Sequence, residues 1–401
     1  MSDRHEQQRA KDYLELEGLR GFLVLAVAVE HSYFTLKYAG NQSIWRLEPF
    51  QRLHSVDEYI VRTILMFAEG IGAVLVFFAV SGFVLAHALT KRSDALFPAG
   101  PGTSGRLKDQ YYYLGLQRFF RIFPLHWAVL FLIAAVFPFI EPAAAAYASE
   151  FYTNYQTRVP AREELLGLVF FSNISNPPTW SLLHETWALL AFPLFLTLLD
   201  RWRDTSLQIL LLVILFIVGA ATQLWLDVAW VRNPFLFLSL FVGGAAVYKH
   251  QEALRQIKMG PPLVYWLALS SVRLISGGFQ NAYIWFWMSA FALLLLCSVI
   301  AAGHSLSGRV LRSRVMVWLG TRSYGIYILH FPVNYLIATG VLQHAPESLL
   351  QLHAVATGTF IAAASILTTV AICAFAAYPF ESYWQRLRQK ITSPPEKVLP
   401  P

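Results

Sequence analysis

Ten apolar segments divide the chain, and charged residues, prolines or glycines bound each of them. A helix needs about 20 apolar residues to cross the hydrocarbon core of a bilayer, so each segment is predicted to be a transmembrane helix. The predicted spans cover residues 17–37, 71–90, 112–138, 180–199, 206–226, 233–249, 262–276, 282–302, 322–342 and 353–380. The seventh is the weakest, because Arg273 and the "SGG" at 276–278 shorten it. The pattern therefore predicts an all-α, polytopic transmembrane bundle of about ten spans.

The basic residues alternate between the predicted loops. Of the 31 lysines and arginines, 23 fall on one side of the predicted membrane and eight on the other. The positive-inside rule then places both termini in the cytoplasm, as expected for a multi-pass protein of the inner (plasma) membrane. The predicted organisation is a cytoplasmic tail at 1–13, one transmembrane domain at 14–385 and a second cytoplasmic tail at 386–401. The long outward loops are predicted at about 38–70 and 139–179.

The composition excludes two large classes of protein. Only 14% of the residues are charged, 56% are hydrophobic, and the mean hydropathy is +0.48. A soluble domain usually carries about a quarter charged residues. The net charge of +7 is scattered between apolar runs, so no nucleic-acid surface is predicted. Cys297 and Cys373 lie in apolar stretches and are interpreted as packing residues, so neither a disulfide nor a metal site is predicted.

Ionisable residues lie deep in the first predicted span, "LELEGLRGFLVLAVAVEHSYFTL" at 14–36. Arg20 and His31 are 11 residues apart, close to three turns, so they share a helix face about 16 Å apart along the axis. Arg20 alone is better explained as a charge that sets orientation. A functional role is favoured for His31 over a structural hydrogen bond, because ionisable groups inside a membrane are costly. Glu30 points about 100° away and is expected to reach the outer interface instead.

A second ionisable group lies in "NPPTWSLLHETWALLAFPLF" at 176–195. Helix geometry places Glu185 at a depth similar to that of His31. A carboxylate at that depth needs a partner, and His31 is the expected one. The alternative is a structural bond from Glu185 to a tryptophan or to backbone groups. His184 points elsewhere and is interpreted as structural.

Two further motifs carry candidate chemistry. In "QRFFRIFPLHW", Arg118 and Arg121 share one helix side and could hold phosphate oxygens, although a pair that only sets topology explains the spacing equally well. In "SYGIYILHFPV", His330 precedes Pro332. The proline frees a carbonyl and bends the helix, and such breaks often line a cavity. A structural histidine at a kink has equal weight.

These motifs resemble a known family. "LEGLRGFLVLAVAVEH", "FFAVSGFVL", "QRFFRIFPLHW", "WSLLHETWALLAFPL" and "YGIYILHFPV" occur in order from residue 14 to about 335, and "YPFESYWQRLR" closes the pattern. Together they resemble the integral membrane acyltransferase 3 family, which transfers acyl groups, often acetyl, from acyl-CoA to hydroxyls of extracytoplasmic glycans. The resemblance implies an acyl-CoA donor, a glycan or glycolipid acceptor such as an exopolysaccharide or lipopolysaccharide unit, and contact with membrane lipids.

The resemblance also assigns roles. Residues implied in catalysis are His31, Glu185 and His330, and those implied in donor binding are Arg20, Arg118 and Arg121. Histidine has an unperturbed pKa of about 6.5, which suits a general base, so His31 is predicted to deprotonate the acceptor hydroxyl, with Glu185 orienting its ring. The arginine pair would hold CoA phosphates at the inner face. Departures from the family pattern occur at Glu17, Glu30 and His126, and they leave the acceptor open.

Another function class would use the same residue types. A proton-coupled transporter also carries buried histidines and glutamates as a proton relay. Many transporters show internal symmetry between two halves, and no such symmetry is found in this sequence. Acyl transfer is therefore the favoured prediction, with transport as the alternative.

Overall fold

The structure, which is a computed structural model, consists mostly of helices. It describes residues 13–96, 103–141, 143, 146–155, 176–202, 204–225, 233–277, 282–302 and 305–392, and no strand occurs in these ranges. The predicted tail at 1–13 and the end of the tail at 386–401 therefore lie largely outside the described residues. The predicted all-α fold is confirmed.

Each of the ten predicted spans overlaps one main helix, and the last also covers a π-helical turn and the start of the next helix. The main helices are α2 (Leu14–Tyr33), α4 (Gly70–Leu96), α5 (Thr103–Val136), α8 (Trp180–Arg201), α9 (Thr205–Trp225), α10 (Pro234–Lys249), α12 (Pro262–Ser276), α13 (Ala282–Ala301), α16 (Ser323–His344) and α18 (Ala354–Ile372). Among the described residues, seven helical stretches are long and apolar enough to cross a membrane, α10 and α12 are shorter apolar helices, and the charged helix α2 is in neither group. The number of crossings and the side of the termini remain predictions.

Shorter elements connect these helices. They are η1 (Phe50–Arg52), α3 (Val56–Phe67), η2 (Phe137–Phe139), α6 (Glu150–Tyr155), η3 (Pro177–Thr179), α11 (Gln251–Gln256), α14 (Leu306–Leu311), α15 (Arg314–Thr321), α17 (Glu347–Leu352), a π-helical turn at Cys373–Ala377, and α19 (Tyr378–Thr392). The segment at 38–70 was predicted as a loop, which is wrong for its second half. A capping box starts α3 there, because Ser55 accepts from the Glu58 amide while the Glu58 carboxylate accepts from the Ser55 amide.

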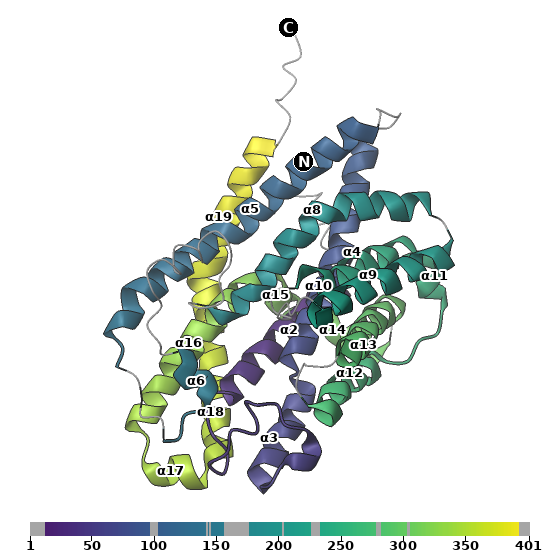
Figure 1. Cartoon of the computed structure of the whole chain (residues 1–401). Coiled ribbons are helices and arrows are strands. Elements are labelled where there is room, and N and C mark those ends of the chain that lie inside the picture. Colours follow the sequence, from purple (N-terminus) through teal and green to yellow (C-terminus); the bar gives the residue numbers. More distant parts are fainter. Residues whose placement is uncertain are drawn as a thin grey trace.

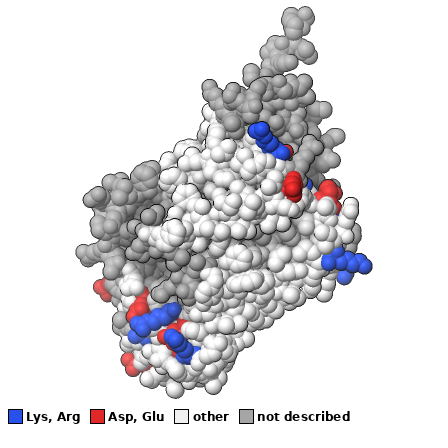
Figure 2. All heavy atoms as spheres, turned by 45° about the vertical axis from the view of Figure 1, so that its right-hand side comes forward, with Lys and Arg blue, Asp and Glu red and all other residues white. Residues whose placement is uncertain are grey.

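The charged surface lies toward two ends of the molecule. In Figure 1, α3, α6 and α17 lie toward one end, and the last turns of α19 lie toward the other. Figure 2 shows lysine, arginine, aspartate and glutamate gathered toward the lower left and the upper right of that face, with uncharged surface between them. An uncharged belt between charged ends is what a protein surrounded by hydrocarbon requires.

Helix α2 approaches its neighbours closely because glycines lie at the contacts of its inner half. A Cβ added to Gly18 would lie 1.7 Å from the Leu311 carbonyl oxygen, and one added to Gly320 would lie 1.7 Å from that of Glu17. Small residues at such contacts let helix backbones approach closely, as membrane helices often do. Helices α14 and α15 therefore hold α2 in place, and α4, α16 and α18 pack along the rest of it.

A buried charge cluster joins α2 to α4 and α12. Arg273 in α12 donates from Nη2 to Glu30 Oε1 at 2.7 Å and from Nη1 to Glu69, which directly precedes α4. The three side chains are 1–5% exposed. The expectation that Glu30 reaches the outer interface is therefore wrong. In a low-dielectric interior a carboxylate that finds a guanidinium is stabilised by it.

Removal of Arg273 should destabilise the bundle strongly. Arg273→Ala leaves two buried carboxylates without their counterion, and breaking a buried ion pair in this way costs about 3–5 kcal/mol. The matched control is Arg255→Ala, whose partner Glu252 forms an exposed pair at 3.2 Å, so a loss of about 0–1 kcal/mol is expected. Thermal unfolding of the purified protein in detergent measures both. Equal transition temperatures for the two variants would show that the cluster does not hold the helices together.

Candidate functional site

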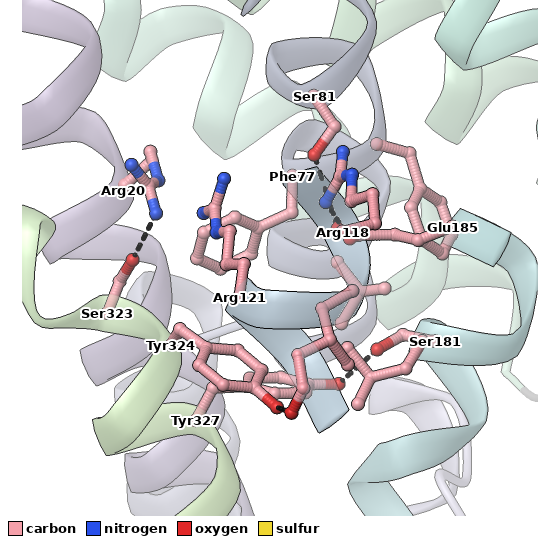
Figure 3. Close-up of a pocket in the computed structure, with 14 residues that line it drawn as sticks. Arg20, Phe77, Ser81, Arg118, Arg121, Ser181, Glu185, Ser323, Tyr324 and Tyr327 are labelled. Atoms are coloured by element: carbon pink, nitrogen blue, oxygen red, sulfur yellow. Dashed lines mark hydrogen bonds and ion pairs between the residues drawn. The ribbon is translucent and has the colours of Figure 1, made fainter. Parts of the chain in front are cut away.

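A cavity lies between α2, α4, α5, α8 and α16. Its lining residues are Arg20, Val74, Phe77, Phe78, Ser81, Arg118, Arg121, Ile122, Ser181, Leu182, Glu185, Ser323, Tyr324 and Tyr327 (Figure 3). Its volume is about 60 Å³, which is room for a few water molecules or a small organic group. A second cavity shares the three arginines and continues along α4 as far as Ala88. From Val74 to Ala88 the two cavities follow α4 for about 21 Å.

Three arginines form a cationic layer across the first cavity. Arg118 Nη1 lies 2.5 Å from Glu185 Oε2, and Arg20 donates to Glu17 at 2.9 Å and to Ser323 at 2.9 Å. Arg121 lies between the other two arginines (Figure 3). Among the described residues, no carboxylate lies within ion-pair distance of Arg121. The buried carboxyl of Glu381 in α19 is further away but interacts electrostatically with Arg121 and Arg20. The Arg121 guanidinium, which has no ion pair at contact distance, can therefore hold an anion.

Glu185 was predicted to contact His31, and it does not. One carboxylate oxygen accepts from Arg118, and the other accepts from Ser81 at 3.2 Å. The predicted pairing is wrong because a permanently charged guanidinium on α5 lies within reach, and it binds a carboxylate more strongly than a neutral imidazole does. Glu185 therefore belongs to the arginine layer.

His31 instead pairs with His330, which the sequence had marked on a separate motif. His31 Nδ1 lies 2.8 Å from His330 Nε2, and the two ring planes are 5° apart. His330 Nδ1 lies 2.6 Å from the Tyr327 carbonyl oxygen. A carbonyl can only accept, so His330 Nδ1 carries a hydrogen and its neutral Nε2 accepts from His31 Nδ1. Because the hydrogen of His31 is on Nδ1, Nε2 keeps a free lone pair, which a general base needs to accept a proton.

The carbonyl freed by the proline inside α16 has a specific partner. Pro332 has no N–H, so the carbonyl of Ile328, four residues earlier, loses its helical donor. Asn176 Nδ2 donates to that oxygen at 2.9 Å, and Asn176 is fully buried. The prediction that Pro332 frees a carbonyl is therefore confirmed, and the "NPP" corner before α8 supplies the missing donor. Sequence reasoning missed Asn176, although its place in a proline corner was visible.

Further groups hold His31 from its outer side. Asn334 donates from Nδ2 to the His31 carbonyl oxygen at 3.2 Å and accepts from Ser365 at 3.1 Å. The Phe151 ring stacks on the His31 ring at 5.5 Å, and Trp45 lies 4.8 Å from Phe151. Asn334 was also missed. It follows His330 by four residues and so shares its helix face, a spacing that could have identified it.

Tyr327 contacts both the arginine cavity and the histidine pair. Its ring lines the arginine cavity, and its hydroxyl donates to the Pro178 carbonyl oxygen at 2.8 Å and lies 2.8 Å from Ser181 Oγ. Its own carbonyl accepts from His330. The histidine pair therefore begins one helical turn beyond the end of the cavity. Among the described residues, no group of three or more His, Cys, Asp or Glu side chains is placed to hold a metal ion.

A family model described as an acyltransferase domain matches residues 13–378. No curated protein and no solved structure matches the chain. The matched range runs from the residue before α2 to the first residue of α19, and it includes all six residues that the sequence assigned to catalysis or donor binding.

Because Asn176 replaces a missing backbone donor, the stability lost on removing its side chain should depend on Pro332. Asn176→Ala leaves the buried Ile328 carbonyl unsatisfied, which costs about 1–3 kcal/mol. In a Pro332→Ala background the restored backbone N–H binds that carbonyl, so the same substitution should cost little. A double-mutant cycle on thermal stability in detergent measures the coupling, expected at about 1 kcal/mol or more. Additive effects of the two substitutions would contradict this pairing.

Proposed function

Because the chain belongs to the integral membrane acyltransferase 3 family, we propose that it transfers an acyl group from cytoplasmic acyl-CoA to a hydroxyl of an extracytoplasmic glycan. The observation that carries this proposal is the arrangement of the two sites. A cationic cavity and a histidine pair lie on the same helices, and Tyr327 contacts both. An anionic donor and a hydroxyl acceptor could therefore meet within one bundle.

The cationic layer suits the phosphates of the donor. Arg121 faces the cavity without a carboxylate partner among the described residues, and Arg20 lies beside it (Figure 3). The second cavity leads from this layer toward Ala88, on the side predicted to be cytoplasmic. A volume of about 60 Å³ admits only part of a coenzyme, so the first cavity would receive part of the arm that joins the phosphates to the thioester, with the thioester directed toward His31. We assign direct phosphate contact to Arg121 and Arg20, with Arg118 held in place by Glu185.

The histidine pair suits general base catalysis. His31 Nε2 would take the proton from the acceptor hydroxyl while the hydroxyl oxygen attacks the thioester carbonyl carbon. The tetrahedral adduct then collapses, the carbon–sulfur bond breaks, and the proton on His31 passes to the departing thiolate sulfur. His330 would hold the tautomer of His31 and accept a stronger hydrogen bond from the imidazolium. It thus takes the orienting part first predicted for Glu185.

The acceptor would approach from the opposite side. His31 is half-buried, and the half-buried rings of Phe151 and Trp45 lie next to it in the segments that follow α2 and contain α6. Such aromatic faces suit apolar contact with a sugar ring, so a glycan or glycolipid is the proposed partner. Reaction at this depth requires a multi-pass protein, and the plasma membrane is its proposed location.

The donor assignment predicts different effects for two neighbouring arginines. Arg121→Gln removes the guanidinium that has no ion pair at contact distance and should weaken acetyl-CoA binding by about 10-fold or more, as expected for a lost charged hydrogen bond. The double variant Arg118→Gln, Glu185→Gln removes an ion pair without changing the net charge, so its loss should be smaller. Binding of labelled acetyl-CoA to the full-length protein in detergent tests both. Wild-type affinity in Arg121→Gln would exclude Arg121 as a donor ligand.

The proposed role of His330 predicts different activities for its Gln and Asn variants. His31→Ala should bind acetyl-CoA but lose about 10²–10⁴-fold in transfer rate. His330→Gln can place its oxygen near the former Nε2 and accept from His31, so it should retain part of the activity. His330→Asn ends near the former Nδ1, keeps the bond to the Tyr327 carbonyl and loses the contact with His31, so it should be less active than the Gln variant.

The assay that tests the reaction itself uses membrane vesicles containing the protein, labelled acetyl-CoA, and mass spectrometry of the glycans. Label should enter glycan ester groups with the wild type and not with His31→Ala. Normal labelling by His31→Ala would refute the proposed mechanism. An Asn variant of His330 more active than the Gln variant would refute the assigned tautomers.

A further inference from the structure

A buried carboxyl in α19 lies near the arginine layer without a contact partner. Glu381 is 7% exposed, and its Oε1 atom is buried and forms no hydrogen bond with the described residues. Within the described part of the chain, no lysine or arginine lies within ion-pair distance of it. The carboxyl nevertheless interacts electrostatically with Arg121, Arg20 and Arg322. Glu381 is therefore a buried acid under the influence of three cations, none of which it touches.

The π-helical turn before α19 keeps Glu381 on the buried face of its helix. Side chains spaced four residues apart along α18, the π-turn and α19 are all buried, namely Ile361, Ser365, Thr369, Cys373, Ala377 and Glu381. In an ideal α-helix, each step of four residues turns the side chain by about 40°, so this series would leave the buried face. The wider π-turn at Cys373–Ala377 offsets part of that rotation. The carboxyl is therefore held against the bundle by the course of the backbone.

Helix α16 leaves room for this carboxyl at Gly325. A Cβ added there would lie 2.7 Å from Glu381 Oε1 and 2.7 Å from Cys373 Sγ. The preceding residue, Tyr324, lines the arginine cavity, and its hydroxyl donates to the Ile122 carbonyl oxygen of α5 at 2.6 Å (Figure 3). Glu381 therefore packs against the segment of α16 that forms one wall of the arginine cavity.

Two other titratable groups face Glu381, the phenol of Tyr324 and the thiol of Cys373. The phenol donates its hydrogen to the Ile122 carbonyl, and the thiol donates its hydrogen to the Arg322 carbonyl at 3.6 Å. A group that donates to a carbonyl is stabilised in its protonated form, and guanidiniums keep their charge at all ordinary pH values. Glu381 is therefore the group in this cluster that can exchange a proton near neutral pH.

Resting on the acyl-CoA donor assigned above, we propose that Glu381 couples donor binding to the uptake of a proton. A buried carboxylate is stable only while nearby cations compensate for its lost hydration. The donor phosphates bring negative charge to Arg121 and Arg20, so these cations compensate Glu381 less once the donor is bound. The carboxylate oxygen then takes a proton from the solvent and loses its charge. Donor affinity should therefore fall as the pH rises, because charged Glu381 and the phosphates compete for the same cations.

Calorimetry measures this proton directly. Acetyl-CoA is titrated into the purified full-length protein in detergent, between about pH 7 and pH 9, in two buffers whose ionisation enthalpies differ. The difference in heat gives the number of protons taken up for each donor bound. Phosphate groups lose their second proton near pH 6, so the donor itself contributes little in this range.

Two variants remove the titratable group while keeping the length of the side chain. Glu381→Gln is polar and Glu381→Met is apolar and flexible, so one remains informative if the other fails to fold. The matched control is Glu252→Gln, the same substitution at a glutamate of α11 whose side chain is 78% exposed.

The wild type and Glu252→Gln should take up a proton fraction that approaches about one at the optimal pH, and their affinity for acetyl-CoA should fall as the pH rises. The Glu381 variants should lose this uptake. At the alkaline end they should bind acetyl-CoA about 10-fold more tightly than the wild type, as expected for removing one charge about 10 Å from the phosphates. Loss of a merely structural residue would not tighten binding.

Two results would overturn this proposal alone. One is a wild type that binds acetyl-CoA without proton uptake at any pH in the range, and the other is uptake that persists in the Glu381 variants that fold. A folded wild type that binds no acetyl-CoA overturns the donor assignment as well, which distinguishes the two failures.

Discussion

The ion pair between Arg118 and Glu185 decides what the centre of this bundle can do. It links α5 to α8 at 2.5 Å, and it engages the carboxylate of α8 that faces the cavity. Arg121 is then left facing the cavity without a carboxylate partner among the described residues. A buried guanidinium without an ion pair at contact distance is costly, and a bound anion relieves that cost. The pair thus creates a site with a preference for negative charge.

The same ion pair explains why His31 and His330 contact each other. With Glu185 engaged by Arg118, the partner of His31 is His330 across the contact between α2 and α16. The direction of the hydrogen bonds is then determined by the backbone, because the Tyr327 carbonyl can only accept. Pro332, two residues beyond His330 on α16, frees the Ile328 carbonyl, and Asn176 satisfies it.

Much of the fold could be predicted from the sequence, because membrane helices are encoded by the length of apolar runs. All ten predicted segments are helices, and the main local error was α3, whose amphipathic pattern lies within a loop rich in charge. The residues of the site were also visible, because ionisable groups in apolar segments are few. Their partners were not predictable. Helix geometry gives the depth of a residue along the axis of its helix but not which helix packs beside it. Glu185 was therefore predicted to bind the wrong partner, and Glu30 was wrongly predicted to reach the outer interface.

Two clusters of buried charge in this bundle differ in a way that separates structure from function. Around Arg273, two carboxylates meet one guanidinium, the groups are 1–5% exposed, and they do not line either arginine cavity. Arg121 has no carboxylate within ion-pair distance among the described residues, and its side chain lines a cavity. A cation already paired with protein carboxylates gains little from a bound anion, whereas a cation without an ion pair is stabilised by one. Burial of charge alone therefore does not separate a structural cluster from a ligand site in this bundle. A cation without an ion pair beside an open volume is the feature on which the proposed donor role of Arg121 rests, and Arg273 lacks it.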